Sequence, residues 1–157
     1  GLKNELRLRK DFDDPHHEAL LGIYYTANRI RKAAAEFFSK QRVTDVQFNA
    51  MELLRYQAGE EGGLTQVELS QMMLVNRANI TTLIDRMEKA GVVERVVSAT
   101  DRRYNIVRLT PKGRALQEKI EDAYMAEVQR IMGPLNKTEL KTLMQLLERV
   151  RQPLSGG

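Results

Sequence analysis

The chain has 157 residues, of which 42% are hydrophobic and 29% charged, a composition that predicts a single domain over residues 1–157 with a core of its own. Because the sequence contains no cysteine, it excludes structural disulfides, a thiolate zinc site and thiol-based redox sensing. The formal net charge of +4 suits a polyanionic partner without demanding one. No transmembrane run or signal-peptide pattern occurs, so we expect a cytoplasmic protein.

Two helices are predicted in the first 58 residues. Asp14 is an N-cap followed by Pro15 at the first helical position, and apolar residues at helical spacing continue to about Lys40. Thr44 and Gln47 then form a capping box, which opens a second helix that runs to about residue 58.

The segment after residue 63 predicts two further helices joined by a tight turn. Thr65 and Glu68 form a second capping box, and the helix that they open should end near Met73. Asn76 can cap the next helix, predicted over Arg77–Ala90. One face of that helix is apolar and predicted to be buried, with residues at i, i+3, i+4 and i+7: Ile80, Leu83, Ile84 and Met87.

A β-hairpin is predicted directly after this pair of helices. Gly91 suits a left-handed helix C-cap, and the β-branched run 92–97 predicts a strand. Residues 98–103 form a polar tip, and 104–109 alternate as a returning strand. Thr110-Pro111 then opens another helix. Helix, turn, helix and hairpin in this order predict a winged helix-turn-helix over residues 44–110.

Two helices are predicted at the C-terminal end. The helix from Pro111 should stop at Gly133-Pro134, and Asn136 and Glu139 form a third capping box. The last helix has a narrow apolar seam with residues three and four apart: Leu140, Leu143, Leu147, Val150 and Leu154. Such a seam packs against another helix, either in a second subunit or in the helix that begins at Pro111.

Several motifs carry a family resemblance. They are Leu64-Thr65-Gln66-Val67-Glu68-Leu69, Val75-Asn76-Arg77-Ala78-Asn79-Ile80-Thr81, Arg86-Met87-Glu88-Lys89-Ala90-Gly91-Val92-Val93, Asp101-Arg102-Arg103 and Val107-Arg108-Leu109-Thr110-Pro111-Lys112-Gly113. Together they resemble the MarR family of transcriptional regulators. The Asp-Arg-Arg followed by a strand ending in Leu-Thr-x-x-Gly is the most specific part. Asn79 and Thr82 depart from the family's common pattern, which leaves the operator sequence open.

The resemblance implies a mainly α fold with a small β-hairpin (α+β) and a dimer. Helices of residues 14–40 and 111–154 would interlock two subunits, with Leu20 and the apolar seam of the last helix at the interface. A two-fold homodimer presents two recognition helices to successive major grooves, so the operator should be a pseudo-palindrome.

The resemblance also implies the residues that contact double-stranded DNA. They are Thr65, Asn76, Arg77, Ala78, Asn79, Thr81, Thr82, Arg86, Asp101, Arg102 and Arg103. Early residues of the second winged-helix helix would read base edges in a major groove, and Arg86 would contact phosphate. The alternative is a solvated helix face, with Arg86 in an ion pair with acids near Asp85 and Glu88.

The hairpin tip is assigned to the minor groove. An arginine on a narrow hairpin can enter the negative minor groove while a neighbouring carboxylate orients its partner. We assign Arg102 to the groove and Arg103 to backbone contact or pairing with Asp101, although the order could be reversed. The alternative is a charged turn that serves only solubility.

Many members of the family bind a small aromatic carboxylate, which suggests an effector crevice in this chain. Its candidate residues are Tyr24, Tyr25, Arg29, Phe48, Met51 and Tyr56, with Arg29 as the carboxylate anchor. The competing interpretation places the apolar ones in the core and Arg29 on the surface. His16-His17 offers no third ligand, so we expect no metal site and no cofactor.

The sequence disfavours an enzyme. It contains no cysteine nucleophile, phosphate-binding glycine loop or nucleophile elbow, and its only histidines are neighbours at a helix start. We therefore expect a sequence-specific DNA-binding regulator, a repressor that a small aromatic anion releases. The alternative is a winged-helix docking or architectural module, which would tend to carry apolar residues in place of Arg102 and Arg103.

Overall fold

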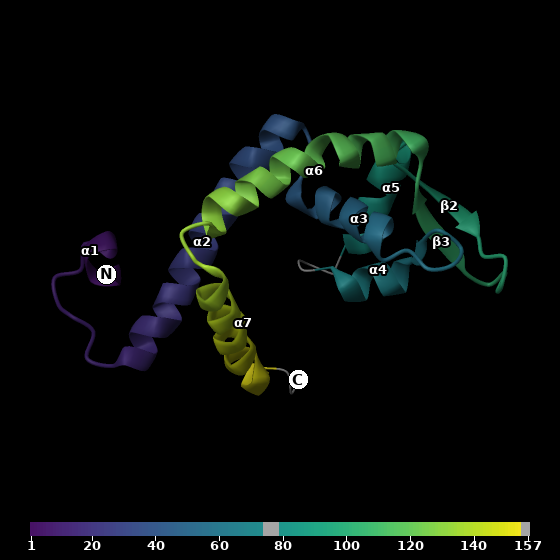
Figure 1. The fold of residues 1–157 in the computed structure, drawn as a ribbon. Helices are drawn as coiled ribbons and strands as arrows, with labels where there is room; N and C mark the ends of the chain where they lie inside the picture. The colour runs from purple at the N-terminus through teal and green to yellow at the C-terminus, as the bar shows by residue number, and fades with distance from the viewer. Residues whose placement is uncertain (74–78, 155–157) are drawn as a thin grey trace. The chain divides into compact units, whose positions relative to one another are not determined.

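The computed structural model describes residues 1–73 and 79–154, which fall into two compact units, Gly1–Gln117 and Glu118–Gly157. The first unit holds α1 (Leu2–Leu6), α2 (Pro15–Gln41), α3 (Asp45–Tyr56), β1 (Leu64–Thr65), α4 (Gln66–Met72), α5 (Ile80–Lys89), β2 (Val93–Val97), β3 (Asn105–Leu109) and the start of α6 (Pro111–Met132) (Figure 1). The second holds the rest of α6, α7 (Lys137–Arg151) and a 3₁₀ turn (Gln152–Leu154). The fold is mainly helical with one small sheet, which confirms the predicted class.

Four of the predicted helix starts are confirmed by their hydrogen bonds. The Asp14 carboxylate accepts the N–H of His16 at 2.8 Å, with Pro15 in the first turn of α2. The other three starts are reciprocal capping boxes, in which each side chain bonds the other's backbone N–H: Thr44 with Gln47, Thr65 with Glu68, and Asn136 with Glu139. Each box satisfies N–H groups that have no partner within the helix.

The end of α5 is fixed by a left-handed glycine. Gly91 has φ 73°, its N–H donates to the carbonyl of Glu88 at 2.8 Å, and the Val92 N–H donates to that of Met87 at 2.9 Å. This pair of bonds is the Schellman motif, which favours glycine because a Cβ is strained in this conformation. The chain therefore turns directly from α5 into β2.

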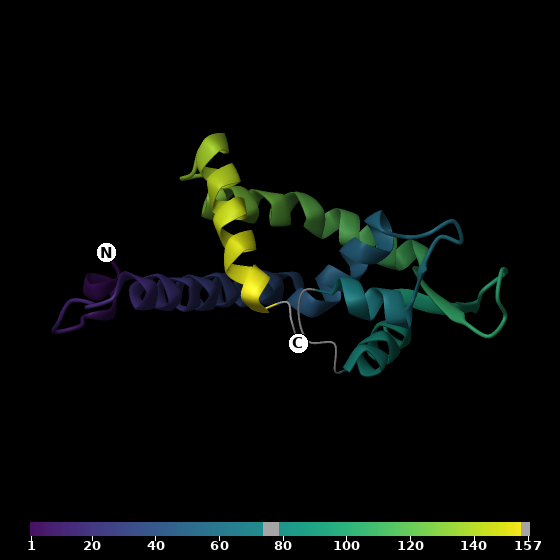
Figure 2. The same cartoon turned by 90° about the horizontal axis from the view of Figure 1, so that it is seen from below.

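The sheet has three antiparallel strands in the order β1-β3-β2. In the hairpin, Val93 lies opposite Leu109 and Val97 opposite Asn105. Leu64 of β1 lies opposite Val107 of β3, which adds a short third strand that the sequence did not predict. The hairpin extends away from α3, α4 and α5 in both ribbon views (Figures 1 and 2), so the tip of the wing projects beyond these helices.

The start of α6 is tied to the base of the wing. The Thr110 hydroxyl accepts the N–H of Gly113 at 3.0 Å and donates to the carbonyl of Gly91 at 2.6 Å. A Cβ at position 113 would lie 1.9 Å from the Val92 carbonyl oxygen, so only glycine fits there. These contacts explain the Thr-x-x-Gly pattern at the end of the wing.

The core of the winged helix is apolar and closed. Its members are fully or almost fully buried and come from α3, α4, α5 and the sheet: Phe48, Met51, Leu54, Leu69, Ile84, Met87, Val93, Ile106 and Val107. Ile84 and Met87 carry the predicted buried face of α5, while Ile80 and Leu83 are half-buried.

Two features differ from the predicted elements. Helix α5 begins at Ile80 with Asn79 as its N-cap, three residues later than predicted, and residues 74–78 lie outside the described part. The short α1 at the N-terminus was not predicted. Within residues 1–73 and 79–154, no helix has a stretch both long and apolar enough to cross a membrane.

Candidate nucleic-acid interface

The start of α5 exposes polar side chains on the face opposite the core. Thr81, Thr82 and Arg86 are exposed, whereas Ile84 on the other face has no exposed surface. Asn79 is also exposed, and its side chain makes no capping bond to α5. The predicted contacts Asn76, Arg77 and Ala78 lie outside the described residues. The described part of this face therefore offers two threonines, an asparagine and an arginine.

A shallow groove runs beside these side chains. Thr44, Asp45 and Gln47 at the start of α3 face Thr82 and Arg86 of α5 across a cavity of about 370 Å³. Arg86 makes no ion pair or hydrogen bond with another described residue. Its guanidinium is therefore available at the edge of the groove.

Arg95 fixes α5 against the sheet and α4. Its guanidinium, from β2, lies 2.6 Å from Asp85 and 2.6 Å from Glu88, both on α5. Two further hydrogen bonds, at 3.1 and 3.0 Å, go to the side-chain oxygen of Gln66 on α4. Burial acts to lower the pKa of Arg95, but the hydrogen bonds and charges of Asp85 and Glu88 together raise it. The acids that were considered as partners of Arg86 are thus held by Arg95.

Thr81 is the last member of this network. The Gln66 amide donates to the Thr81 hydroxyl at 3.1 Å while its oxygen accepts from Arg95. The Thr81 hydroxyl thus accepts a hydrogen bond from Gln66 and donates none to a residue in the described part of the chain. Sequence reasoning missed the roles of Gln66 and Arg95, since they join residues 15 and 29 positions apart.

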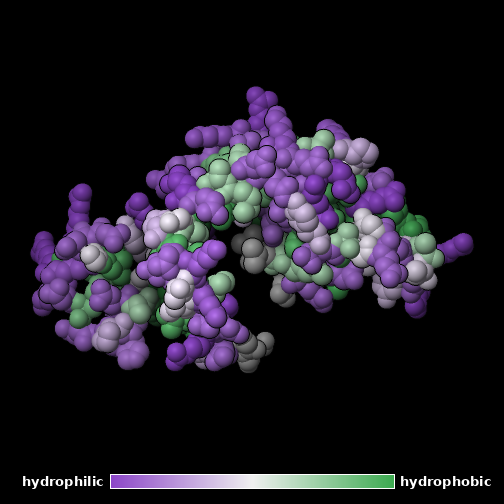
Figure 3. All heavy atoms as spheres, in the orientation of Figure 1, coloured by the Kyte–Doolittle hydropathy of each residue, from purple (hydrophilic) through white to green (hydrophobic). Residues whose placement is uncertain are grey.

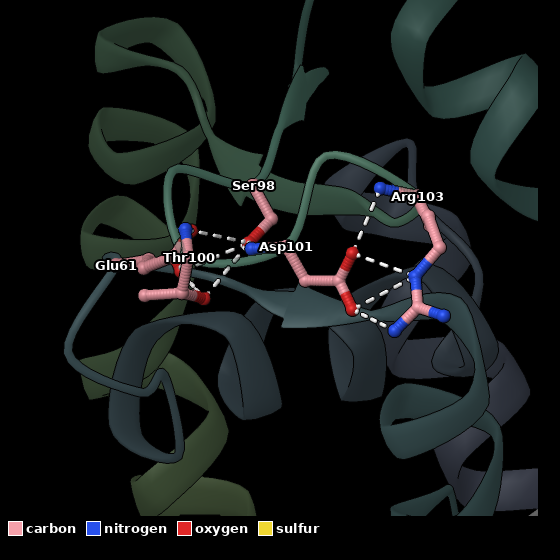
Figure 4. Close-up of polar contacts among 5 residues, drawn as sticks. All are labelled: Glu61, Ser98, Thr100, Asp101 and Arg103. Atoms are coloured by element: carbon pink, nitrogen blue, oxygen red, sulfur yellow. Dashed lines mark hydrogen bonds and ion pairs between the residues drawn. The ribbon is translucent and has the colours of Figure 1, made fainter.

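The wing tip holds one of its two arginines in place. Arg103 forms a bidentate pair with Asp101, with N–O distances down to 2.6 Å, and its backbone N–H also donates to that carboxylate (Figure 4). These hydrogen bonds hold the pKa of Asp101 below its usual value. Arg103 also lies 5.8 Å from the centre of the Tyr104 ring.

Arg102 is the other arginine of the tip. It is exposed, and it forms no hydrogen bond or ion pair with any residue in the described part of the chain. The tip thus presents one free guanidinium beside one that an internal carboxylate orients.

A residue outside the wing anchors the tip from the other side. Glu61, in the loop before β1, accepts hydrogen bonds from Ser98 and Thr100 (Figure 4) and from the Ala99 N–H. The hydroxyl of Thr100 is the main cause that lowers the pKa of Glu61. Sequence reasoning missed Glu61, because the contacts span up to 39 positions and the loop showed no motif.

Comparison with known proteins decides the family. The family model described as MarR family matches residues 43–103, which include α3, the helix pair and most of the wing. The regulator PecS of Dickeya dadantii is 27% identical over 125 residues, covering 80% of this chain and 75% of PecS. MarR of Salmonella typhimurium is 27% identical over 129 residues, covering 82% of this chain and 87% of that protein.

Solved structures agree with these relatives. A MarR mutant from E. coli, in complex with operator DNA, is 28% identical with a TM-score of 0.72, covering 88% of this chain and 99% of that one. AbsC of Streptomyces coelicolor shares the fold, with a TM-score of 0.80 at 19% identity over 94% of this chain and all of that one.

The winged helix of this chain is thus of the MarR type, and the relatives that align with most of the chain's length include regulators of this kind. The MarR family consists of transcriptional regulators, not enzymes. These matches confirm the resemblance drawn from the Asp-Arg-Arg and Leu-Thr-x-x-Gly motifs.

The hydroxyl of Thr65, a predicted DNA contact, is hydrogen-bonded within the chain. Its hydroxyl accepts the Glu68 N–H at 3.2 Å and donates to the Glu68 carboxylate at 2.9 Å. The hydroxyl thus uses its hydrogen and one lone pair to cap the start of α4. A DNA contact by Thr65 stays a prediction, and its hydroxyl hydrogen is already donated to Glu68.

The candidate effector residues lie in different environments. Tyr25 and Arg29 are neighbours on α2, with 3.4 Å between the guanidinium and the phenol oxygen. Tyr24 and Tyr56 are exposed, whereas Phe48 packs beside Phe38 in the core, with ring centres 5.2 Å apart. Met51 is buried and lines a different cavity of about 230 Å³, with the cations Arg42 and Lys112 at its rim.

The predicted interface residues remain open to an additional partner. Leu20 on α2, Val150 on α7 and Leu154 are exposed by 48, 45 and 76%. Leu140, Leu143 and Leu147 are half-buried, and α7 contains no buried residue. Figure 3 shows hydrophobic surface among hydrophilic side chains along α7.

The described residues hold no cluster suited to a metal ion. They contain no group of three or more histidine, cysteine, aspartate or glutamate side chains that could hold a metal ion. His16 instead bonds Asp14, with 2.8 Å between its ring nitrogen and the carboxylate oxygen.

Proposed function

We propose that this chain is a sequence-specific, double-stranded DNA-binding repressor that acts as a homodimer on a pseudo-palindromic operator. In this proposal α5 enters the major groove, where Asn79, Thr81 and Thr82 face base edges and Arg86 faces phosphate. The wing lies over the adjacent minor groove. MarR of E. coli, a relative solved with its operator, supports the proposal by analogy.

The observation that carries the proposal is the state of Arg102. An exposed guanidinium with no partner among the described residues stands at the tip of the hairpin, beside Asp101 and Arg103, which are paired with each other. The narrow minor groove concentrates negative potential and attracts an inserted arginine. A winged helix that only docks onto another protein would not need an unpaired arginine at its tip.

The homodimer is supported by unpartnered apolar residues at both ends of the chain. Leu20, Ile23 and Ile30 on α2, and Met144, Leu146 and Val150 on α7, are at least 38% exposed. Helices with such faces stabilise themselves by packing against another copy. A two-fold dimer would then place its two α5 helices about one helical turn of DNA apart.

Release by a small aromatic carboxylate is the finer part of the proposal. The cavity beside Met51 combines an apolar wall, which includes Met87 and Val92, with Arg42 and Lys112. An apolar pocket with few cations suits an aromatic ring that bears one carboxylate. The Lys112 ammonium already donates to the Ala90 carbonyl at 2.7 Å, so Arg42 is the freer anchor.

Selection from a randomised duplex pool tests DNA reading. We expect Arg102→Ala to bind about tenfold or more weakly while it selects the same major-groove bases, because minor-groove readout is degenerate. Thr82→Ala should change which bases are selected, at a cost of about 1–3 kcal/mol. Arg31→Ala, which removes an equal charge from α2, is the matched control.

Two outcomes would overturn this part. Wild-type protein that recovers no duplex contradicts DNA binding and supports the docking module. Equal weakening by Arg102→Ala and Arg31→Ala would show that only net charge matters, and it would remove the wing arginine from the mechanism.

Thermal shift with benzoate and hydroxybenzoates tests the effector. Arg42→Gln should lose the ligand-induced shift if the cavity beside Met51 is the site, while Arg29→Gln retains it. The reverse pattern would favour the Tyr25–Arg29 position on α2. No shift in wild-type protein across the panel contradicts release by aromatic carboxylates.

A further inference from the structure

We propose that Glu61 is a positioning residue for DNA binding, which holds the wing tip so that Arg102 meets the minor groove. The proposal rests on the proposed function, because it concerns how the wing reaches DNA. It assigns a role to a residue that lies outside both the helix pair and the hairpin.

The Glu61 carboxylate collects four donors from the wing. The Ser98 hydroxyl and the Ala99 N–H each lie 3.0 Å away, and the Thr100 N–H lies 3.2 Å away. The fourth donor is the Thr100 hydroxyl. One side chain thus accepts hydrogen bonds from two consecutive backbone N–H groups of the wing tip, and Figure 4 shows its contacts with Ser98 and Thr100.

The contacts continue through the tip to the arginines. Ser98 is buried, and its oxygen accepts the N–H groups of Thr100 at 3.2 Å and Asp101 at 3.0 Å. Asp101 in turn binds Arg103 through both side-chain and backbone groups. Arg102 therefore sits between two residues whose backbone and side-chain positions are both set.

The loop that carries Glu61 is itself closed. The Gly59 N–H donates to the Gly63 carbonyl at 3.1 Å, and the Gly62 N–H donates to the Gly59 carbonyl at 2.9 Å. β1 follows directly and pairs with β3, so the loop is tethered to the sheet from which the wing extends. The Glu61 carboxylate thus links the loop before β1 to the tip of the wing.

The charge of Glu61 and its contacts with the wing predict opposite effects of its replacement on DNA affinity. A carboxylate beside a DNA-binding surface repels phosphates, so its neutralisation alone should tighten binding. Loss of the contacts between Glu61 and the wing tip should weaken DNA binding, because the tip must then be ordered when DNA binds. Glutamine at position 61 keeps the size of the side chain but turns one acceptor into a donor that faces other donors.

The test compares Glu61→Gln with Glu60→Gln on the duplex that wild-type protein selects from a randomised pool. Both variants gain one unit of net charge, but only Glu61 contacts the wing. We expect Glu61→Gln to bind about tenfold more weakly, the equivalent of losing one or two net hydrogen bonds. Glu60→Gln should bind equally or slightly more tightly.

A double-mutant cycle separates positioning from general damage. In the Arg102→Ala background, Glu61→Gln should cause no further loss, because the group that it positions is gone. Hydroxyl-radical protection in the minor groove should disappear in Glu61→Gln, while protection of guanine N7 in the major groove persists. Thr100→Val removes a donor without changing charge and should weaken binding in the same direction, which keeps the test valid if Glu61→Gln folds poorly.

The outcomes distinguish this proposal from the one on which it rests. Wild-type protein that selects no duplex contradicts the proposed function and the role of Glu61 together. Wild-type protein that binds, with Glu61→Gln binding as tightly as Glu60→Gln, contradicts the role of Glu61 alone. Additive losses in the cycle would contradict it as well.

Discussion

The winged helix and α7 use their apolar residues in opposite ways. Leu69, Ile84 and Val107 in the winged helix have no exposed surface, whereas α7 buries none of its residues and Leu146 is 50% exposed. Burial of an aliphatic side chain contributes about 1.5–3 kcal/mol. The winged helix therefore stabilises itself, and the seam of α7 gains this free energy only when another surface covers it.

Their polar contacts differ in the same way. In the winged helix, Arg95 and Glu61 join residues 29 to 39 positions apart. In α7 the Thr142 hydroxyl instead donates to the Thr138 carbonyl, four positions away. The winged helix is thus cross-linked between its elements, whereas α7 presents an exposed apolar seam.

The largest effect is expected from a charge in the seam of α7. Leu147→Glu should dissociate the proposed homodimer, and loss of two-site binding should lower duplex affinity by about 100-fold or more. Gln145→Glu, an equal charge at an exposed polar position of the same helix, is the control. Sedimentation should give half the mass for Leu147→Glu only; equal masses for both variants contradict the seam as an interface.

The next largest effect is expected on the free energy of unfolding of the winged helix. Ile84→Ala should lower the free energy of unfolding by about 2–5 kcal/mol, because a cavity forms in a closed core. Leu146→Ala on α7 removes a similar volume from a half-exposed site and should cost much less when both variants are measured at a concentration at which the proposed dimer is dissociated. Chemical denaturation at fixed protein concentration checks both, and equal losses would break the contrast between the two regions.

A smaller effect is expected at the Arg95 network. Arg95→Ala leaves Asp85, Glu88 and Gln66 without their shared donor, so the free energy of unfolding should fall by about 1–3 kcal/mol. Arg108→Ala breaks the more exposed pair with Glu94, whose N–O distance is 2.7 Å, and should cost at most about 1 kcal/mol. A thermal melt that ranks the two variants in the reverse order contradicts the network's role.

The smallest effect is expected from mild acid on the wing. Hydrogen bonds from Arg103 hold the pKa of Asp101 below its ordinary 3.8, and those from Thr100 hold the pKa of Glu61 below 4.5. For a lowered pKa, the contribution is complete above the ordinary value and is lost only as the pH falls through the lowered one. The affinity ratio of wild type to Arg102→Ala should thus stay constant from about pH 8 to about pH 5; a ratio that falls toward one in this window contradicts it.

The sequence predicted what depends on neighbouring residues. The Thr44, Thr65 and Asn136 boxes and the Gly91 turn were all found, because a cap involves groups within four positions. The pairing of Asp101 with Arg103, one of the alternatives for the tip, is local for the same reason. Family motifs then supplied the order of elements around these caps.

Long-range contacts could not be predicted in this way. β1 has only two residues, and its pairing with Val107 depends on the fold rather than on a periodic pattern. Glu61 and Arg95 look like ordinary surface charges in the sequence, since their partners lie in other elements. The predicted start of α5 at Arg77 lies outside the described residues, and α5 is described from Ile80; apolar spacing fixes the face of a helix better than its first residue.

The central claim is that two copies of this chain place two winged helices on one duplex. A chemical footprint of wild-type protein on its selected duplex, with the mass of the complex from sedimentation, tests it most directly. We predict two copies per duplex and two symmetric sets of protections whose centres lie about one helical turn apart. A single copy with one protected patch, bound as tightly to an isolated half-site as to the whole duplex, would contradict the account.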